Sequence, residues 1–339
     1  MLPGPRLVMS SGSDSRAGTS SGPGSRGVAG RLTSPVAIGS RRLPPIGLVV
    51  LAAVGLVLLA VIGAFEWTHL NDEYAYWQAG ARLWAGQPLY DAAAAPNTPY
   101  AYWYPPPLAQ VMAPLTAVLS ADVFAVLWTA LLLACLWWLG GRNVLVALAL
   151  VAFLPVAVEL RVRNVHLVIA VLAVLALRRS SLFWVPATAL KITPVLGVVY
   201  EAAAGRWREA AKAGVLGGVV LVASLLLAPT AWREFVDVVG ARAGTDGGSL
   251  FPAIPFAARL AAGAILAVVA GRLAARASAR GGTAWRAESL LIVALVVANP
   301  TLWATAFSML VAIVPLWRSR EHEAAAAAAP VAGQVSVPA

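Results

Sequence analysis

Residues 46–65 read IGLVVLAAVGLVLLAVIGAF, a run of apolar residues without a single charge. As a helix, this run extends about 30 Å, which is the thickness of the hydrocarbon core of a bilayer. Similar runs recur along the chain, and in lipid each must satisfy its own backbone hydrogen bonds, which favours helices. Further apolar segments are predicted at 106–120, 123–140, 143–158, 164–177, 182–203, 212–228, 256–271, 287–299 and 302–317.

The composition supports a membrane protein. Of 339 residues, 60% are hydrophobic and 12% are charged, with a mean hydropathy of +0.78, whereas about a quarter of a typical soluble chain is charged. We therefore predict an all-α, polytopic membrane protein with about 9 to 12 transmembrane or re-entrant helices. The net charge of +10 is typical of the positive-inside rule, so no nucleic-acid partner is expected.

Both ends of the chain differ from this apolar body. Residues 1–43 are rich in Ser, Gly and Arg, and we expect a disordered cytoplasmic tail that is not a signal peptide. Residues 321–339 are predicted to form a second disordered tail. The membrane domain is then 44–320, and because 46–65 runs outward from the cytoplasm, residues 66–104 are expected to be extracytoplasmic.

Basic clusters between the segments predict broken helices. They cannot all be cytoplasmic if every segment crosses completely, so 182–203 is expected to enter and return as two half-helices. The break falls near KITP, 191–194, because proline disfavours a continuous helix. Segment 106–120 is short and carries several prolines, so it too is expected to be partial.

A polar stretch directly follows the first apolar run: HLNDEYAYWQAGARLWAGQPLYD, 69–91. Tyr74 and Trp77 stand at helical spacing, which predicts an amphipathic helix on the outer membrane surface. An aromatic interface belt is an alternative explanation of these rings. It does not explain Asp72 and Glu73, because carboxylates add little to anchoring. A carboxylate beside the bilayer is well placed to act as a general base on a hydroxyl group.

Three cationic side chains are candidates for binding phosphate. Arg161 and Arg163 interrupt an apolar context in VELRVRNVHLVIA, 158–170, and arginine suits phosphate by its planar pair of donors. On the cytoplasmic side they would instead be ordinary positive-inside charges. Lys191 is isolated among apolar residues, where a buried charge requires a partner. It either meets phosphate in a cavity or extends to the interface.

The remaining motifs are less specific. The tyrosines of PYAYWYPPPLAQ, 99–110, including Tyr104, could stack on sugar rings or form an interface belt, and the prolines fix a turn. One cysteine and three widely spaced histidines give no metal motif. No P-loop, GxSxG, HExxH or CxxC arrangement is present, so nucleotide-driven transport and soluble-type hydrolysis have no direct support.

Taken in order, several stretches resemble the integral-membrane GT-C glycosyltransferases, and most closely glycosyltransferase family 87. The resemblance covers about 60–318 and depends on the order of its motifs more than on any one of them. Those motifs are NDEYAYWQAGARLWAGQPLYD, YWYPPPLAQVMAPLTAVL, RVRNVHLVIAVLAVLALRR, ATALKITPVLGVVYEAAAGRWRE and NPTLWATAFSMLVAIVPLWR.

The resemblance implies a GT-C-type helical bundle that transfers a sugar, with inversion, from a polyprenyl-phosphate donor on the outer face of the plasma membrane. The acceptor would be a glycolipid or glycan of the cell envelope. Asp72 matches the family's acidic residue after the first span and would be the base, with Glu73 as the fallback. Because the sugar is already activated on its lipid, no nucleotide site is needed. No cofactor is expected, and no residue is assigned as a metal ligand. The donor phosphate is expected on Arg161, Arg163 and Lys191, and the substrates on Tyr74, Trp77, Tyr104, Asn164 and His166.

The sequence also departs from the family. Where relatives carry an acid- and histidine-bearing stretch near the end, this chain reads NPTLWATAF, and a GQxN-like element appears as RNVH. The resemblance favours mannose, with arabinofuranose from decaprenyl-phosphate-arabinose as the alternative. A lipid or sugar transporter without transferase activity is the competing class, because intramembrane charges and broken helices also occur there. The scarce lysine fits a GC-rich genome such as an actinobacterial one.

Overall fold

The computed structural model describes residues 36–38, 41–65, 71–91, 101–242 and 249–319. Most of the predicted tail 1–43, all of 321–339, and residues 66–70 and 92–100 of the predicted loop 66–104 lie outside this range. Two compact units divide at Gly47. The first contains a short antiparallel hairpin of β1 (Val36–Ile38) and β2 (Arg41–Leu43), in which Ala37 pairs with Arg42.

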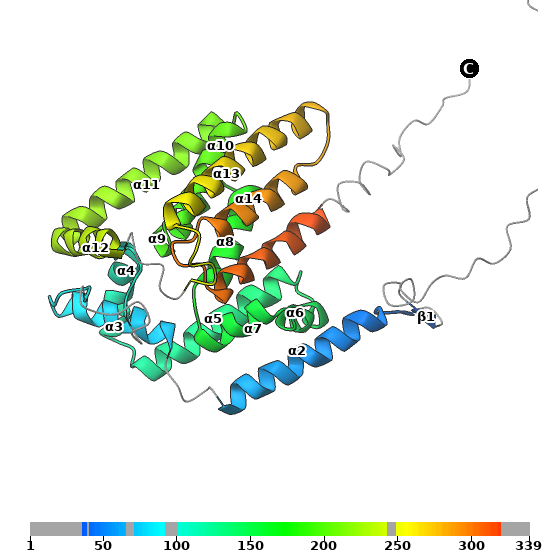
Figure 1. Ribbon diagram of the computed structural model, residues 1–339. Coiled ribbons are helices and arrows are strands. Elements are labelled where there is room, and N and C mark those ends of the chain that lie inside the picture. Colours follow the sequence, from blue (N-terminus) through cyan, green and yellow to red (C-terminus); the bar gives the residue numbers. More distant parts are fainter. Residues whose placement is uncertain (1–35, 39–40, 66–70, 92–100, 243–248, 320–339) are drawn as a thin grey trace, which may run out of the picture. The chain divides into compact units, whose positions relative to one another are not determined.

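Among its described residues, the second unit contains helices and no strands (Figure 1). After α2 (Ile46–Phe65), its helices are α3 (Asp72–Trp84), α4 (Pro106–Thr116), α5 (Ala121–Leu139), α6 (Val144–Val151), α7 (Leu154–Val162), α8 (His166–Arg178), η1 (Ser181–Phe183), α9 (Trp184–Leu190), η2 (Thr193–Val195), α10 (Leu196–Ala203), α11 (Trp207–Leu227), α12 (Pro229–Arg242), α13 (Phe256–Ala279), α14 (Trp285–Val297) and η3 (Ala304–Ala312), which continues as α-helix over 313–319. The predicted all-α class is confirmed.

Four helices are long and apolar enough to cross a membrane: α2, α5, α11 and α13. A fifth crossing is possible if α6 and α7, which meet at 89°, form one span. The remaining apolar segments of the described chain form shorter or interrupted helices. This arrangement is that of a polytopic membrane protein, and several of the ten predicted segments form less than a full crossing.

The predicted break near KITP is confirmed. Helix α9 ends at Leu190, Lys191 is extended with φ −152° and ψ 143°, and η2 begins at Thr193. Pro194 provides the physical reason, because in a continuous helix it would have no N–H to donate to the carbonyl of Leu190 and its ring would clash with that carbonyl. The predicted shortness of 106–120 is confirmed as well, since α4 has 11 residues.

Two features differ from the prediction. Segment 143–158 is not one helix, because Phe153 is extended and Pro155 starts α7 afresh, where the missing N–H does no harm. Helix α7 then continues to Val162, so Arg161 lies on a helix and not in a loop. Helix α12 was not predicted at all, because its apolar and charged residues alternate and give no apolar run.

Two glycines allow helices to approach closely. A Cβ atom on Gly55 of α2 would lie 1.8 Å from the carbonyl oxygen of Leu148 on α6, so only glycine fits there. A Cβ atom on Gly80 of α3 would lie 2.8 Å from the backbone and side chain of Met112 on α4. Gly80 therefore lets α3 pack directly on α4, which fixes the helix that begins with Asp72.

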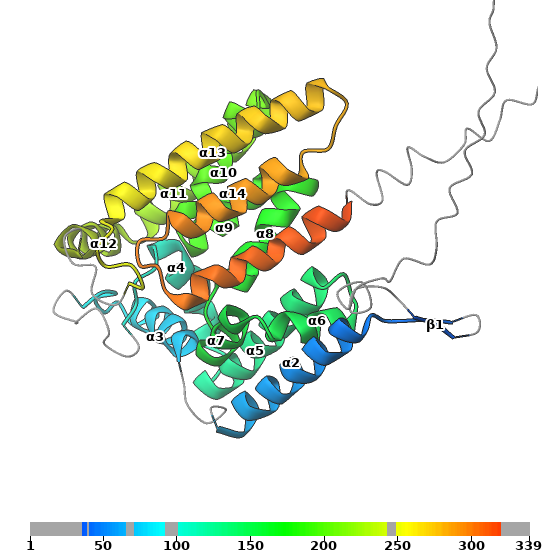
Figure 2. The same ribbon diagram turned by 45° about the vertical axis from the view of Figure 1, so that its right-hand side comes forward.

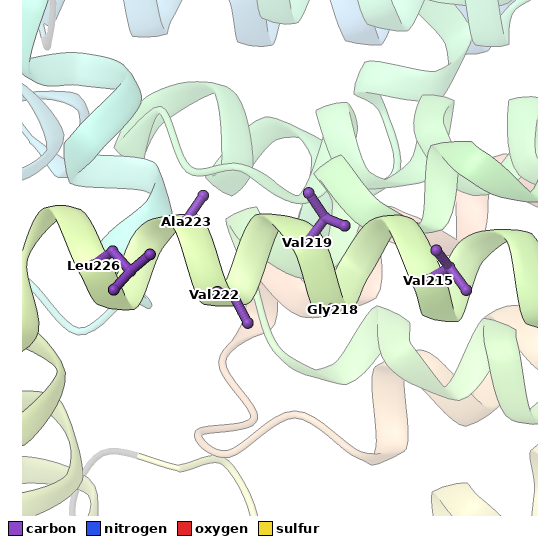
Figure 3. A pocket seen from close by; sticks show the side chains of 6 residues that line it. All are labelled: Val215, Gly218, Val219, Val222, Ala223 and Leu226. Atoms are coloured by element: carbon purple, nitrogen blue, oxygen red, sulfur yellow. The ribbon is translucent and has the colours of Figure 1, made fainter.

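The buried core surrounds α8, and the outer helices expose apolar side chains. On α11, a shallow apolar depression is lined by Val215, Gly218, Val219, Val222, Ala223 and Leu226, as Figure 3 shows. Val215 is 70% exposed and Leu226 is 79% exposed. Apolar exposure of this kind is typical of a surface that faces lipid. Helices α3, α4 and α12 lie at one end of this helical unit, and the loop between α13 and α14 lies at the other (Figures 1 and 2).

Candidate functional site

A cluster of polar side chains forms where several helix ends meet. Its residues come from the start of α3, the segment before α4, the end of α7 with the turn to α8, and the break after α9. We call it the polar cluster; its members are Asp72, Glu73, Tyr76, Tyr104, Glu159, Arg163, Asn164, His166 and Lys191. Most are buried, whereas Asp72 and Lys191 are half-buried. The cluster therefore presents one carboxyl group, that of Asp72, and one amino group, that of Lys191, toward its surroundings.

Asp72 is held by one of its two carboxylate oxygens. Asn164 Nδ2 donates to Asp72 Oδ2. The amide of Asn164 is itself fixed, because its Oδ1 accepts from Val165 N at 2.7 Å and from the Tyr104 hydroxyl at 3.2 Å. The Tyr76 hydroxyl in turn lies 3.0 Å from the Tyr104 hydroxyl. Among the described residues, Asp72 Oδ1 makes no hydrogen bond, so this oxygen can receive one from a ligand.

The environment of Asp72 shifts its proton affinity. Burial raises the pKa of Asp72 to about 7, and the negative charges of Glu159 and Glu73 contribute to the rise. The hydrogen bond from Asn164 and the positive charge of Lys191 oppose it. A carboxyl group whose pKa lies near neutral is suited to accept a proton at physiological pH.

Glu73 belongs to a buried ion pair. Arg163 Nη1 contacts Glu73 Oε1, and the two side chains are 6% and 0% exposed. Both Glu73 oxygens also accept from Asn71 N at 3.2 Å. Arg163 adopts left-handed backbone with φ 55°, and its carbonyl accepts from Trp128 Nε1 at 2.9 Å. This pair joins the start of α3 to the end of α7 and leaves Asp72 as the more accessible acid.

Glu159, His166 and Lys191 form a second chain of contacts. Glu159 Oε1 accepts from His166 N at 2.6 Å and from Leu167 N at 3.3 Å. Glu159 Oε2 lies 3.0 Å from His166 Nδ1, and His166 Nε2 lies 2.6 Å from Lys191 Nζ. Lys191 Nζ also lies 5.9 Å from the centre of the Tyr104 ring. The ammonium is thus held beside both halves of the cluster.

The structure brings together seven of the ten residues singled out from the sequence: Asp72, Glu73, Tyr104, Arg163, Asn164, His166 and Lys191. The other three have different surroundings. Tyr74 and Trp77 stack on each other with ring centres 6.0 Å apart, and Trp77 Nε1 donates to Leu119 O at 3.0 Å. The side chain of Arg161 is exposed on α7, and its carbonyl accepts from Asn71 Nδ2 at 3.0 Å.

Sequence reasoning missed several members of the site. Glu159 carried a usable signal, because an acid in an apolar run is as conspicuous as Lys191. Tyr76 carried none, since it is one of three aromatic residues in YAYW, 74–77. Asn299 and Ser308 are fully buried and face the imidazole of His166 and the carboxylate of Glu159 respectively.

Comparison with known proteins identifies the family. The sequence model of Glycosyltransferase family 87 matches residues 102–338, more than half of the chain. The three cluster members on α3, Asp72, Glu73 and Tyr76, precede the matched range, and the other members lie within it. No curated protein and no solved structure matches the chain. The chain belongs to glycosyltransferase family 87, and its activity is that of a membrane glycosyltransferase.

Proposed function

We propose that this enzyme transfers a sugar from a polyprenyl-phosphate donor to a glycolipid or glycan of the cell envelope, with inversion and with Asp72 as the general base. One observation carries the proposal. The two half-buried members of the polar cluster are a carboxyl group, Asp72, and an amino group, Lys191, and each is hydrogen-bonded to a buried partner. Transfer from a sugar phosphate needs both, because the attacking hydroxyl requires a proton acceptor and the leaving phosphate requires a cation.

In the proposed step, the acceptor oxygen, the anomeric carbon and the leaving phosphate oxygen lie in one line. Asp72 Oδ1 takes the proton of the acceptor hydroxyl as that oxygen bonds to the anomeric carbon. The bond from that carbon to the phosphate oxygen breaks, and its electron pair leaves on the polyprenyl phosphate. Because the acceptor attacks opposite the leaving group, the configuration at the anomeric carbon inverts.

Lys191 is the proposed partner of the leaving phosphate. The charge of Arg163 is already engaged by Glu73, and Arg161 lies on the exposed side of α7. Glu159 is satisfied by two backbone amides and an imidazole nitrogen. Lys191 Nζ contacts the ring of His166 and, among the described residues, forms no ion pair, so its charge is available to a ligand. A fixed cation at the leaving oxygen stabilises the negative charge that develops there.

The distribution of charge along the helices supports an extracytoplasmic site in the plasma membrane. Helix α8 runs about 20 Å from His166 in the polar cluster to Arg178, which pairs with Glu288 at 2.7 Å. At that far end Arg318 Nη1 donates to Gly140 O at 2.7 Å. Further basic residues at the same helix ends are Arg142, Arg179, Arg206, Arg208, Arg280 and Arg286. The positive-inside rule then assigns this end to the cytoplasm and the polar cluster to the outside.

Cysteine labelling tests this orientation. In a Cys135→Ala background, we expect Gln87→Cys, in the exposed turn after α3, to react with a membrane-impermeant maleimide on intact cells. Thr283→Cys, exposed between α13 and α14, should react only after permeabilisation. The reverse pattern would place the polar cluster in the cytoplasm and overturn this part of the proposal.

A transfer assay tests the function itself. The protein in lipid vesicles would be offered radiolabelled polyprenyl-phosphate-mannose or decaprenyl-phosphate-arabinose with membrane glycolipid acceptors. We expect transfer from the mannose donor, because the resemblance favours that sugar. Transfer from the arabinose donor alone would replace the sugar and keep the enzyme class. No transfer from either donor by folded protein would contradict the proposed donors.

The hydrogen bond from Asn164 predicts a shift in the pH profile. Because the base must be unprotonated, kcat/KM should rise with pH up to about 7, the pKa of Asp72, and then level off. The Asn164 amide lowers that pKa, so Asn164→Leu should move the acid limb to higher pH. Profiles of kcat/KM against pH for both proteins measure this shift. An unmoved or lowered limb would show that Asn164 does not act on the base.

A further inference from the structure

Glu159 is a fully buried acid whose side chain reaches from α7 to the first turn of α8. One carboxylate oxygen accepts from the backbone N–H groups of His166 and Leu167, which have no partner within their own helix. The other oxygen lies 3.0 Å from the Nδ1 atom of His166. Capping the helix engages only the first oxygen, so the second contact calls for its own explanation.

The second contact determines which nitrogen of His166 carries the proton. An ionised carboxylate can only accept a hydrogen bond, so opposite ionised Glu159 the imidazole donates from Nδ1. The neutral ring then has a lone pair at Nε2, which lies 2.6 Å from Lys191 Nζ. An ammonium group can only donate, so the two contacts require the same tautomer. Asn299 also faces the ring, but a neutral amide is a weaker acceptor than the Glu159 carboxylate.

We infer that Glu159 is a positioning residue, which fixes the His166 tautomer so that Nε2 holds the Lys191 ammonium in place for the donor phosphate. The inference rests on the proposed function of Lys191. Lys191 lies just after the end of α9, in extended backbone, so no helix restricts its side chain. The hydrogen bond to His166 and the neighbouring Tyr104 ring are what hold Nζ.

Glu159→Gln separates this role from helix capping. The carbonyl oxygen of glutamine can still accept from His166 N and Leu167 N, so the cap and the packing volume are kept. The amide NH₂ then occupies the position of Oε2 and donates to Nδ1. The ring proton must move to Nε2, where it faces the ammonium of Lys191 as donor against donor. We therefore expect the variant to fold with Lys191 displaced.

Nitrogen NMR of the imidazole tests the tautomer without any transfer reaction. With His69 and His322 replaced by glutamine, labelled His166 should show a protonated Nδ1 and an unprotonated Nε2. Glu159→Gln should exchange the two signals. A protonated Nε2 in the parent protein, or unchanged signals in the variant, would overturn the inference. Since this readout needs no substrate, it stands even if the proposed donor is wrong.

Coupled kinetics test the link to Lys191. We expect Glu159→Gln to lower kcat/KM about tenfold or more, the effect of losing a hydrogen bond to a charged group. In a Lys191→Met background the same change should have less than about a twofold effect, because its target is gone. Glu201→Gln is the matched control, because Glu201 is also a buried acid, pairs with Arg206 at 2.5 Å and lies outside the polar cluster. The effects of Glu201→Gln and Lys191→Met on kcat/KM should be additive. Full additivity of Glu159→Gln and Lys191→Met would exclude the positioning role.

Discussion

Asp72→Asn is expected to lower kcat for sugar transfer by roughly a hundred- to ten-thousandfold, the range attributed to a general base. Asparagine has the same size, and its side-chain oxygen can still accept from Asn164 Nδ2, so the local structure should persist. What the variant lacks is the ability to take the acceptor's proton. KM for the donor should change little, because Asp72 interacts with the acceptor and not with the phosphate.

The matched control for this variant is Asp122→Asn. Asp122 also lies in the first turn of a helix, α5, but it is exposed and belongs to no part of the polar cluster. Transfer assays on both variants, in protein shown to be folded by its melting curve, compare the two positions directly. If Asp72→Asn kept more than half of the activity, the base would have to be another group, and Glu73 would be examined next.

Much of the fold follows from features that are local in the sequence. The apolar run 46–65 becomes α2 over the same residues, and the Thr193-Pro194 pair marks the break after α9. Both follow from local chemistry, namely hydrophobicity over one span and the missing N–H of proline. The bend before α7 has the same kind of cause in Pro155 but was not predicted, because the apolar residues continue through it.

The site was predictable where an isolated charge or amide interrupts apolar sequence. Lys191, Asn164 and His166 stand out in this way, and the structure brings them together. Which partner each would meet could not be predicted, because Asp72 and Asn164 are 92 residues apart and only tertiary packing joins them. The same applies to Glu73, whose ion pair with Arg163 had no signal in the sequence, so that only the family resemblance ranked Asp72 above it as the base.

The pairing of Glu73 with Arg163 predicts a large loss of stability on breaking it. Glu73→Gln would leave a buried guanidinium without its carboxylate, and such losses amount to about 3–5 kcal/mol. The expected result is a clear fall in the melting temperature of the protein in lipid or detergent, measured by intrinsic fluorescence. Glu209→Gln, which breaks the exposed pair with Lys212, should leave the melting temperature unchanged, because surface pairs contribute little.

A double variant separates a structural clamp from a catalytic acid. Glu73→Leu combined with Arg163→Met removes both charges together, and replacing a buried pair by apolar residues of similar size is often neutral or stabilising. We therefore expect the double variant to recover most of the melting temperature lost in Glu73→Gln. It should also keep measurable transfer, because Asp72 and Lys191 remain. A double variant that is as stable as the parent protein but wholly inactive would instead assign Glu73 or Arg163 a direct part in the reaction.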